Sequence, residues 1–254
     1  MPSGMRPVLF YVDGVPIYAY GTFFLLSLLT VLGLVLYEAR RRRWPKEEVV
    51  PILLSAFVGG MLGARLSILF FNGWETFPEV LNLAALFDPR IGPGSILGGI
   101  GGAYLGGYIA SRAVGKIGCA CDAFAPAMAL GNAVGRVGIF LAGVDGLGKP
   151  TTFPWGVQLP GNDYLVHPAP LYDAAFDVAW FGVLWALRDH PAMQNGNLLK
   201  FGLAGYALVR FFIEFVRNNR VIWIGLTGQQ LLCLGLLAAL AVWFAFRRPP
   251  LATA

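Results

Sequence analysis

The feature that most constrains this chain is a series of apolar runs, each of about 17 to 23 residues, that recurs along the whole sequence. At ~1.5 Å per residue, a helix of that length crosses the ~30 Å hydrocarbon layer of a membrane. The composition agrees, because 57% of the residues are hydrophobic and 13% are charged, more apolar surface than one soluble core can bury. The runs exclude a soluble enzyme, and they exclude a transmembrane barrel, whose strands alternate over about ten residues.

Charged residues, prolines and glycines bound seven such runs. The expected fold class is therefore an all-α, polytopic membrane protein with seven transmembrane helices. The predicted spans cover residues 17–37, 49–71, 94–111, 119–141, 171–187, 198–216 and 226–246. Without repeats or long low-complexity tracts, we expect one integral membrane domain over residues 1–254, with an outer loop at about 143–169.

Basic residues predict the orientation of these spans. The run Arg40 to Arg43, with Lys46 close behind, directly follows the first span, and such a run stays on the cytoplasmic side. The N-terminus is then outside and the C-terminus cytoplasmic, with 11 of the 19 basic residues at inner positions and five at outer ones. The net charge of +5 therefore reflects membrane edges and indicates no nucleic-acid partner.

The remaining three basic residues, Arg65, Arg136 and Arg210, lie inside predicted spans. An ionisable group at this depth costs at least ~2.5 kcal/mol and is a functional candidate by default. Each lies five or six residues before the outer end of its span, so a shared outward-facing pocket for a lipid phosphate is the favoured interpretation. The alternative is that each arginine snorkels alone or pairs with a carboxylate, as the i, i+4 spacing of Arg210 and Glu214 allows.

Glycines form a second pattern at the entrance to the third span. Gly94, Gly98 and Gly102 repeat every four residues, which permits close approach of two helices. We favour a helix-packing face over a lipid path. A soluble phosphate loop is excluded, because no Lys-Ser/Thr pair follows the glycines and no strand precedes them.

A set of short motifs runs through the sequence in a recognisable order. They are residues 20–21, 63–66, 125–138 with Phe140 and Gly143, 148–151, His167-Pro168, Leu171-Tyr172, 210–217 and 225–229. The set resembles the prolipoprotein diacylglyceryl transferases from about Val8 to Phe246. Seven spans and an outer N-terminus are also what that family has.

The resemblance implies a multi-pass enzyme of the bacterial inner membrane. It would transfer the diacylglyceryl group of phosphatidylglycerol to the lipobox cysteine thiol of a prolipoprotein signal peptide, with membrane lipids around it and no metal or other cofactor. The implied catalytic residues are Arg136, Arg210, Glu214, His167 and Asp145. The implied substrate-binding residues are Tyr20, Arg65, Ser95, Gly98, Gly99, Gly143 and Tyr172.

The sequence departs from the family at three polar positions. Leu97 stands where the family commonly has a histidine, and Ile139 stands where it has an asparagine. Val144 replaces a frequent glutamate, for which Asp145 can substitute. These departures leave Glu214, Asp145 or His167 for the proton step that a thiol nucleophile needs.

Two other functions remain compatible with the sequence. A paralogue would transfer the same lipid group to a different acceptor. A lipid-binding or transport protein would perform no chemistry, which the apolar residues Leu97, Ile139 and Val144 favour. The retained Arg136, Arg210 and Glu214 favour a transferase.

Overall fold

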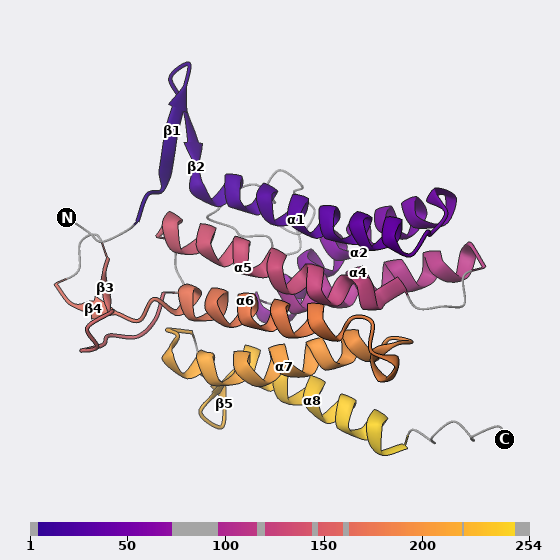
Figure 1. The fold of residues 1–254 in the computed structure, drawn as a ribbon. Helices are drawn as coiled ribbons and strands as arrows, with labels where there is room; N and C mark the ends of the chain where they lie inside the picture. The colour runs from indigo at the N-terminus through magenta and orange to yellow at the C-terminus, as the bar shows by residue number, and fades with distance from the viewer. Residues whose placement is uncertain are drawn as a thin grey trace.

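The computed structural model describes residues 5–72, 96–115, 120–143, 147–159, 163–219 and 221–246. Within these ranges, the long helices are α1 (Ala19–Arg41), α2 (Lys46–Asn72), α4 (Ile96–Ala113), α5 (Phe124–Ala142), α6 (Ala169–Leu187), α7 (Asn197–Ile213) and α8 (Gly228–Phe246). Each predicted span coincides with one of these seven helices, with ends that differ by a few residues. Helix α1 packs on α5, α5 on α6, α6 on α7, and α7 on α8, while α2 and α4 pack mainly on each other (Figure 1).

Short 3-10 helices flank two of these helices, α5 and α7. They are η3 (Ala120–Ala123) before α5, η4 (Pro191–Met193) before α7, and η5 (Glu214–Val216) after α7. The last of them carries the chain directly from α7 into Arg217.

The surface of the helices is that of a membrane protein. Among the described residues, four segments are long and apolar enough to span a membrane by length and composition: Ala19–Arg41, Lys46–Ser67, Cys121–Ala142 and Gly228–Phe246. Large apolar side chains on them, such as Leu25, Leu54 and Val242, remain exposed. A helix exposed to water would turn a polar face outward. The described elements are mostly helical, and their exposed apolar faces make the fold membrane-like.

The described part of the chain contains three two-stranded antiparallel hairpins, which were not expected from the sequence. They are β1 (Val8–Val12) with β2 (Val15–Tyr18), β3 (Val157–Gln158) with β4 (Leu165–Val166), and β5 (Val221–Trp223) with β6 (Leu226–Thr227). All lie toward the same end of the bundle, where α1 begins and α5 ends (Figure 1). We call it the hairpin end, and its small core contains Phe140, Leu147, Val157 and Val166.

The face of α5 that packs on α1 is lined by glycines. A Cβ added to Gly138 would lie 2.3 Å from the Cβ of Phe23, and one added to Gly131 would lie 2.4 Å from Val31 Cγ2. The Ser27 hydroxyl also donates to the Gly131 carbonyl at 2.6 Å. This contact leaves Arg136 to point toward α6, where its carboxylate partner lies.

The glycine repeat of α4 packs against α2, as the sequence predicts. A Cβ added to Gly102 would lie 2.1 Å from the Gly59 carbonyl oxygen, and one added to Gly98 would lie 2.5 Å from the Gly63 carbonyl oxygen. Backbones approach this closely only where both helices lack side chains. Gly94, the first residue of the repeat, lies outside the described residues.

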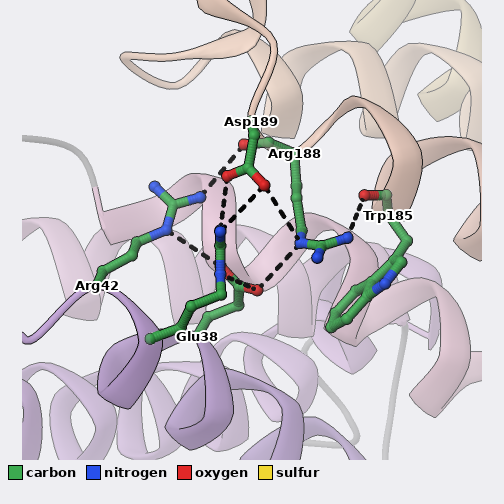
Figure 2. Close-up of polar contacts among 6 residues, drawn as sticks. Glu38, Arg42, Trp185, Arg188 and Asp189 are labelled. Carbon is green, nitrogen blue, oxygen red and sulfur yellow. Dashed lines mark hydrogen bonds and ion pairs between the residues drawn. The ribbon is translucent and has the colours of Figure 1, made fainter.

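At the opposite end of the bundle, a buried carboxylate joins α1 to the turn after α6. The Glu38 side chain accepts hydrogen bonds from Arg41 Nη2 at 2.8 Å and Arg42 Nε at 3.1 Å, and Arg188 Nε lies 3.3 Å from it (Figure 2). Arg41 also reaches Asp189 at 2.6 Å. We call these five residues the Glu38 cluster.

Candidate active site

Three helices bring charged side chains together at the hairpin end. Asp173, in the second turn of α6, has one carboxylate oxygen 3.4 Å from Arg136 Nε of α5. The same oxygen lies 3.8 Å from Arg210 Nη1 of α7 and 3.3 Å from Arg217 Nη1, just beyond η5. Asp173 is therefore the point on which three arginines converge.

Glu214 fixes two of these arginines from the other side. One of its oxygens lies 2.8 Å from Arg210 Nη2 and 3.8 Å from Arg217 Nε. The other oxygen accepts hydrogen bonds from Asn219 Nδ2 at 2.6 Å and Thr227 Oγ1 at 2.9 Å. We call Arg136, Asp173, Arg210, Glu214 and Arg217 the arginine cluster.

The arginine cluster is buried but its donors are not all used. Its five side chains belong to residues that are 1% to 7% exposed. Among the described residues, Arg136 Nε, Arg217 Nε, and Nε and Nη1 of Arg210 have no hydrogen-bond partner, although all but Arg210 Nε face a carboxylate at 3.4 to 3.8 Å. A buried polar group without a partner is costly. Spare guanidinium donors in one place therefore favour an added anion with several oxygen acceptors, such as a phosphate.

Crowding of positive charge is visible in Arg217, which lies outside α7. Burial, followed by repulsion from Arg210 and Arg136, lowers the pKa of Arg217 to about 10. The side chain is still a cation at neutral pH. An anion placed among these arginines would relieve the repulsion that this lowered pKa reports.

Arg65 lies on another part of the site, in α2. It is 3% exposed, and Nε, Nη1 and Nη2 have no hydrogen-bond partner among the described residues. Tyr20, in the first turn of α1, is close enough to interact electrostatically with it. Arg65 therefore faces α1 and does not join the other two arginines predicted from the sequence. Arg217 is the residue that lies beside Arg136 and Arg210 in its place.

His167 and Tyr172 lie in an aromatic group before and in the first turn of α6. His167 Nδ1 is 3.2 Å from the Tyr172 hydroxyl, which also accepts a hydrogen bond from Trp155 Nε1 at 2.8 Å. The His167 ring lies 5.6 Å from that of Phe153, centroid to centroid. Its backbone accepts from Gly148 N and donates to Lys149 O, so the residue also anchors the loop after α5.

Residues 7–246 match the family model described as prolipoprotein diacylglyceryl transferase. The chain belongs to this family. A relative from Chlorobaculum tepidum, named phosphatidylglycerol–prolipoprotein diacylglyceryl transferase, is 31% identical over 96% of this chain and 91% of its own length. Relatives of the same name from Coxiella burnetii and Clostridium tetani are 32% and 30% identical, over 95% and 85% of this chain and 95% and 86% of theirs.

The other residues expected for a prolipoprotein diacylglyceryl transferase are glycines with packing or capping positions, or fall outside the description. Gly98 packs on Gly63 and Ser67, and a Cβ at Gly99 would contact Ala64, so both glycines face α2. Gly143 ends α5 in the left-handed conformation, with φ of 61°. Ser95 and Asp145 fall outside the described residues.

Sequence reasoning missed two members of the arginine cluster. Arg217 lies just beyond the predicted span 198–216 and is not among the predicted site residues, although it follows Arg210 by seven positions and Glu214 by three, the spacing of one helical face. Asp173 is also absent from the site residues that the sequence predicts. An acidic residue in an otherwise apolar run, in a chain with unpaired intramembrane arginines, was the signal that could have identified it.

Proposed function

We propose that this protein transfers the diacylglyceryl group of phosphatidylglycerol to the lipobox cysteine thiol of a prolipoprotein. The observation that carries the proposal is that Arg136 and Arg210 share Asp173 and still have buried guanidinium nitrogens without partners. Membership of the family supplies the reaction, and the relatives' name supplies the two substrates. A phosphate in the arginine cluster satisfies the donors that the protein leaves unpaired.

In this reaction, the substrate thiolate sulfur attacks a glyceryl carbon of the lipid. A carbon–sulfur bond forms, the bond between that carbon and the phosphate oxygen breaks, and glycerol phosphate leaves with the electron pair. Negative charge grows on the departing phosphate in the transition state. Arg136 and Arg210 stabilise it because Asp173 and Glu214 already hold their guanidinium groups in place.

Glu214 acts in this proposal as a positioning residue for Arg210. One of its oxygens is occupied by Asn219 and Thr227, and the other faces Arg210 and Arg217. A base must lie within hydrogen-bond reach of the thiol and free to take its proton. His167 and Asp145 are thus the better candidates for the proton step, since Leu97 replaces the family histidine.

The proposed placement is a single, multi-pass domain of the bacterial inner membrane with seven spans. The hairpin end, with the arginine cluster, lies at the outer surface, and the Glu38 cluster lies at the cytoplasmic one. Support comes from Arg40, Arg43 and Lys46, which are exposed at the Glu38 end, where the positive-inside rule places basic residues. Phosphatidylglycerol headgroups of the outer leaflet would then lie level with Arg136 and Arg210.

Mass spectrometry of a lipobox peptide tests the proposal. Incubated with purified protein and phosphatidylglycerol, the peptide is expected to gain the mass of one diacylglyceryl group at its cysteine. A control peptide with serine at that position is expected to gain nothing. Lipid binding without any mass change would support a lipid-binding protein instead, and modification of another acceptor only would support a paralogue.

A Leu97→His variant, which restores the family histidine, adds a second comparison to the same assay. If the parent protein is active, Leu97→His is expected to be unnecessary for transfer, because placement of lipid and thiol with charge stabilisation supports the reaction. A parent without transfer and a Leu97→His variant that gains it would show instead that this chain has lost the family's chemistry.

A further inference from the structure

Helix α8 begins with a capping box. Thr227 immediately precedes the first residue of the helix, and Gln230 follows Thr227 by three positions, the spacing at which the two residues can bond to each other's backbone. The Gln230 backbone N–H donates to Thr227 Oγ1 at 3.3 Å, and the Thr227 backbone N–H donates to Gln230 Oε1 at 3.0 Å. Both residues are buried, so the position of the Thr227 hydroxyl is fixed by the start of the helix.

The same hydroxyl reaches the arginine cluster. A threonine hydroxyl can accept hydrogen bonds and donate one of its own. Because Thr227 Oγ1 accepts from Gln230, its hydrogen is available to another partner, and it donates to a carboxylate oxygen of Glu214 at 2.9 Å. The Gln230 side chain donates to the Phe211 carbonyl of α7 at 3.3 Å. Two side-chain bonds therefore join the start of α8 to the end of α7.

These bonds determine which oxygen of Glu214 faces the arginines. Thr227 and Asn219 both donate to one oxygen, and the other lies 2.8 Å from Arg210 Nη2. Thr227 is 6% exposed and Asn219 is half-buried, so Thr227 is the donor shielded from water. A carboxylate with both oxygens free can pair with a guanidinium through two parallel hydrogen bonds. Such a pair would use a second nitrogen of Arg210, whose Nε and Nη1 have no hydrogen-bond partner in the described part of the chain.

The Glu38 cluster contains a pair of this kind. Both oxygens of Glu38 accept hydrogen bonds from Arg41, one from Nε at 3.1 Å and the other from Nη2 at 2.8 Å. Arg42 Nε donates to one of the same oxygens. The hydrogen bonds to this carboxylate, within the described residues, come from arginines and not from a hydroxyl or amide group. Glu38 therefore shows how a buried glutamate uses arginine donors when its oxygens have no other partner.

We infer that Thr227 is a positioning residue of the anion site. Its hydroxyl occupies one oxygen of Glu214, which keeps Arg210 from pairing with both oxygens and leaves guanidinium donors free for a phosphate. The capping box supports this role, because the bond from the Gln230 N–H directs the hydroxyl hydrogen toward Glu214. The inference rests on the proposed function, in which the phosphate belongs to the lipid.

Binding of glycerol phosphate, the leaving group of the proposed reaction, tests this role. Calorimetric titration of the purified protein in detergent micelles gives the dissociation constant. Thr227→Val is expected to raise it about tenfold or more, the effect of one hydrogen bond to a charged group, whereas Thr227→Ser keeps the hydroxyl and should stay within twofold of the parent. Thr30→Val is the matched control, since the Thr30 hydroxyl bonds the Leu26 carbonyl within α1. The role is wrong if Thr227→Val binds like the parent, if Thr227→Ser shares the loss, or if the parent does not bind the probe.

A double-mutant cycle shows whether Thr227 acts through Glu214. In a Glu214→Gln background, adding Thr227→Val should change the dissociation constant less than twofold, because the carboxylate that Thr227 positions is gone. An effect of Thr227→Val that is as large in this background as in the parent would be purely structural and would contradict the inference. Thr227→Gly replaces Thr227→Val if that variant does not fold, since glycine is tolerated at the cap position.

Gln230→Ala separates the hydroxyl from the helix cap. This variant loses one half of the capping box but keeps the Thr227 hydroxyl and the backbone N–H that bonds it. We expect a lower melting temperature and a dissociation constant within threefold of the parent. If Gln230→Ala weakens binding as much as Thr227→Val, loss of the cap explains both variants and Thr227 has no role of its own.

The transfer assay with a lipobox peptide distinguishes failure of this inference from failure of the proposed function. A parent protein that binds glycerol phosphate through a Thr227-dependent site, but transfers nothing, supports the positioning role and refutes the transfer reaction. A parent that transfers, together with a Thr227→Val variant that binds and transfers equally well, overturns the positioning role and leaves the proposed function intact.

Discussion

The arginine cluster and the Glu38 cluster have the same composition and opposite character. In each, three arginines surround two acidic residues, one of them a glutamate that is 1% exposed. The clusters lie near opposite ends of α6, since Asp173 and Arg188 are fifteen residues apart, or roughly 22 Å of helix. Net charge therefore does not distinguish them.

The difference lies in solvent and in spare donors. Side chains of Arg41, Arg42 and Arg188 are 20% to 32% exposed, against 5% to 8% for the arginines around Asp173. Arg188 also donates to the Trp185 carbonyl and stacks on the Trp185 ring at 4.0 Å (Figure 2). In the described part of the chain, the Glu38 cluster leaves one buried arginine nitrogen without a hydrogen bond, Arg188 Nε, and it still faces Glu38 at 3.3 Å. The Glu38 cluster is a closed joint between helices, and the arginine cluster, with four such nitrogens, is the one that we propose to be open to an anion.

The largest expected effect comes from changing an arginine of the open cluster. Arg210→Lys keeps the charge but cannot contact Asp173 and Glu214 and still offer a donor to phosphate. We expect the rate of diacylglyceryl transfer to fall about 100-fold or more, the usual effect of removing one transition-state donor. Initial rates with a lipobox peptide measure it. Arg41→Lys is the control, and an equal loss there would erase the distinction between the clusters.

Neutralising Glu214 is expected to have the next largest effect on activity. Glu214→Gln removes the charged partner of Arg210, and we expect a 10- to 100-fold lower transfer rate, whereas His167→Gln should lose less than tenfold because Asp145 remains as the other candidate base. A positioning role leaves the shape of the pH–rate profile of Glu214→Gln unchanged. Loss of one limb of that profile in Glu214→Gln would assign the proton step to Glu214. Parental rates for both variants would show that neither Glu214 nor His167 replaces the missing family histidine.

The counterpart at the closed cluster should affect stability and leave activity intact. Glu38→Gln leaves Arg41, Arg42 and Arg188 without their shared partner, and breaking a buried pair of this kind costs about 3 kcal/mol. Unfolding in detergent micelles measures the loss, and the folded fraction should transfer at a rate within twofold of the parent. Glu47→Gln, at an exposed position, should change stability little. A large rate loss in folded Glu38→Gln would show that the two ends are coupled.

The smallest effect is expected at Asp189. The hydrogen bond from Arg41 lowers the pKa of Asp189, so its contribution to stability is complete above the ordinary pKa of ~3.9 and is lost as pH falls through the lowered value. Because its side chain is 59% exposed, Asp189→Asn should cost less than about 1 kcal/mol at pH 7. Melting temperatures between pH 7 and pH 3 measure this, and a difference that persists unchanged at pH 3 would contradict it.

The sequence predicted the helices well because membrane length and apolar runs constrain them together. The span predicted at 171–187 is α6 (Ala169–Leu187), and the glycine repeat packs as expected. The hairpins were missed, since apolar strands beside apolar helices show no alternation. The Asp13-Gly14 pair was a local signal, and both residues have positive φ, at 48° and 81°, as a two-residue hairpin turn requires.

The candidate site was predictable only where one helix carries the pattern. Arg210 and Glu214 lie one turn apart in the sequence, and the structure pairs them at 2.8 Å. The meeting of Arg136, Asp173 and Arg217 depends on how α5, α6 and α7 pack, because these residues are far apart along the chain. Nothing in the spacing of single helices indicates which carboxylate a neighbouring helix will supply.

The glycine contact between α2 and α4 has a mechanical consequence. Where two backbones touch, as at Gly59 and Gly102, no side chain can change rotamer to absorb a shift of one helix against the other. Helices α2 and α4 must then move together as one rigid unit. Since Ile100 of α4 lines a cavity together with residues of α5, α6 and α7, and Arg65 belongs to α2, any shift of α4 at that cavity also displaces Arg65.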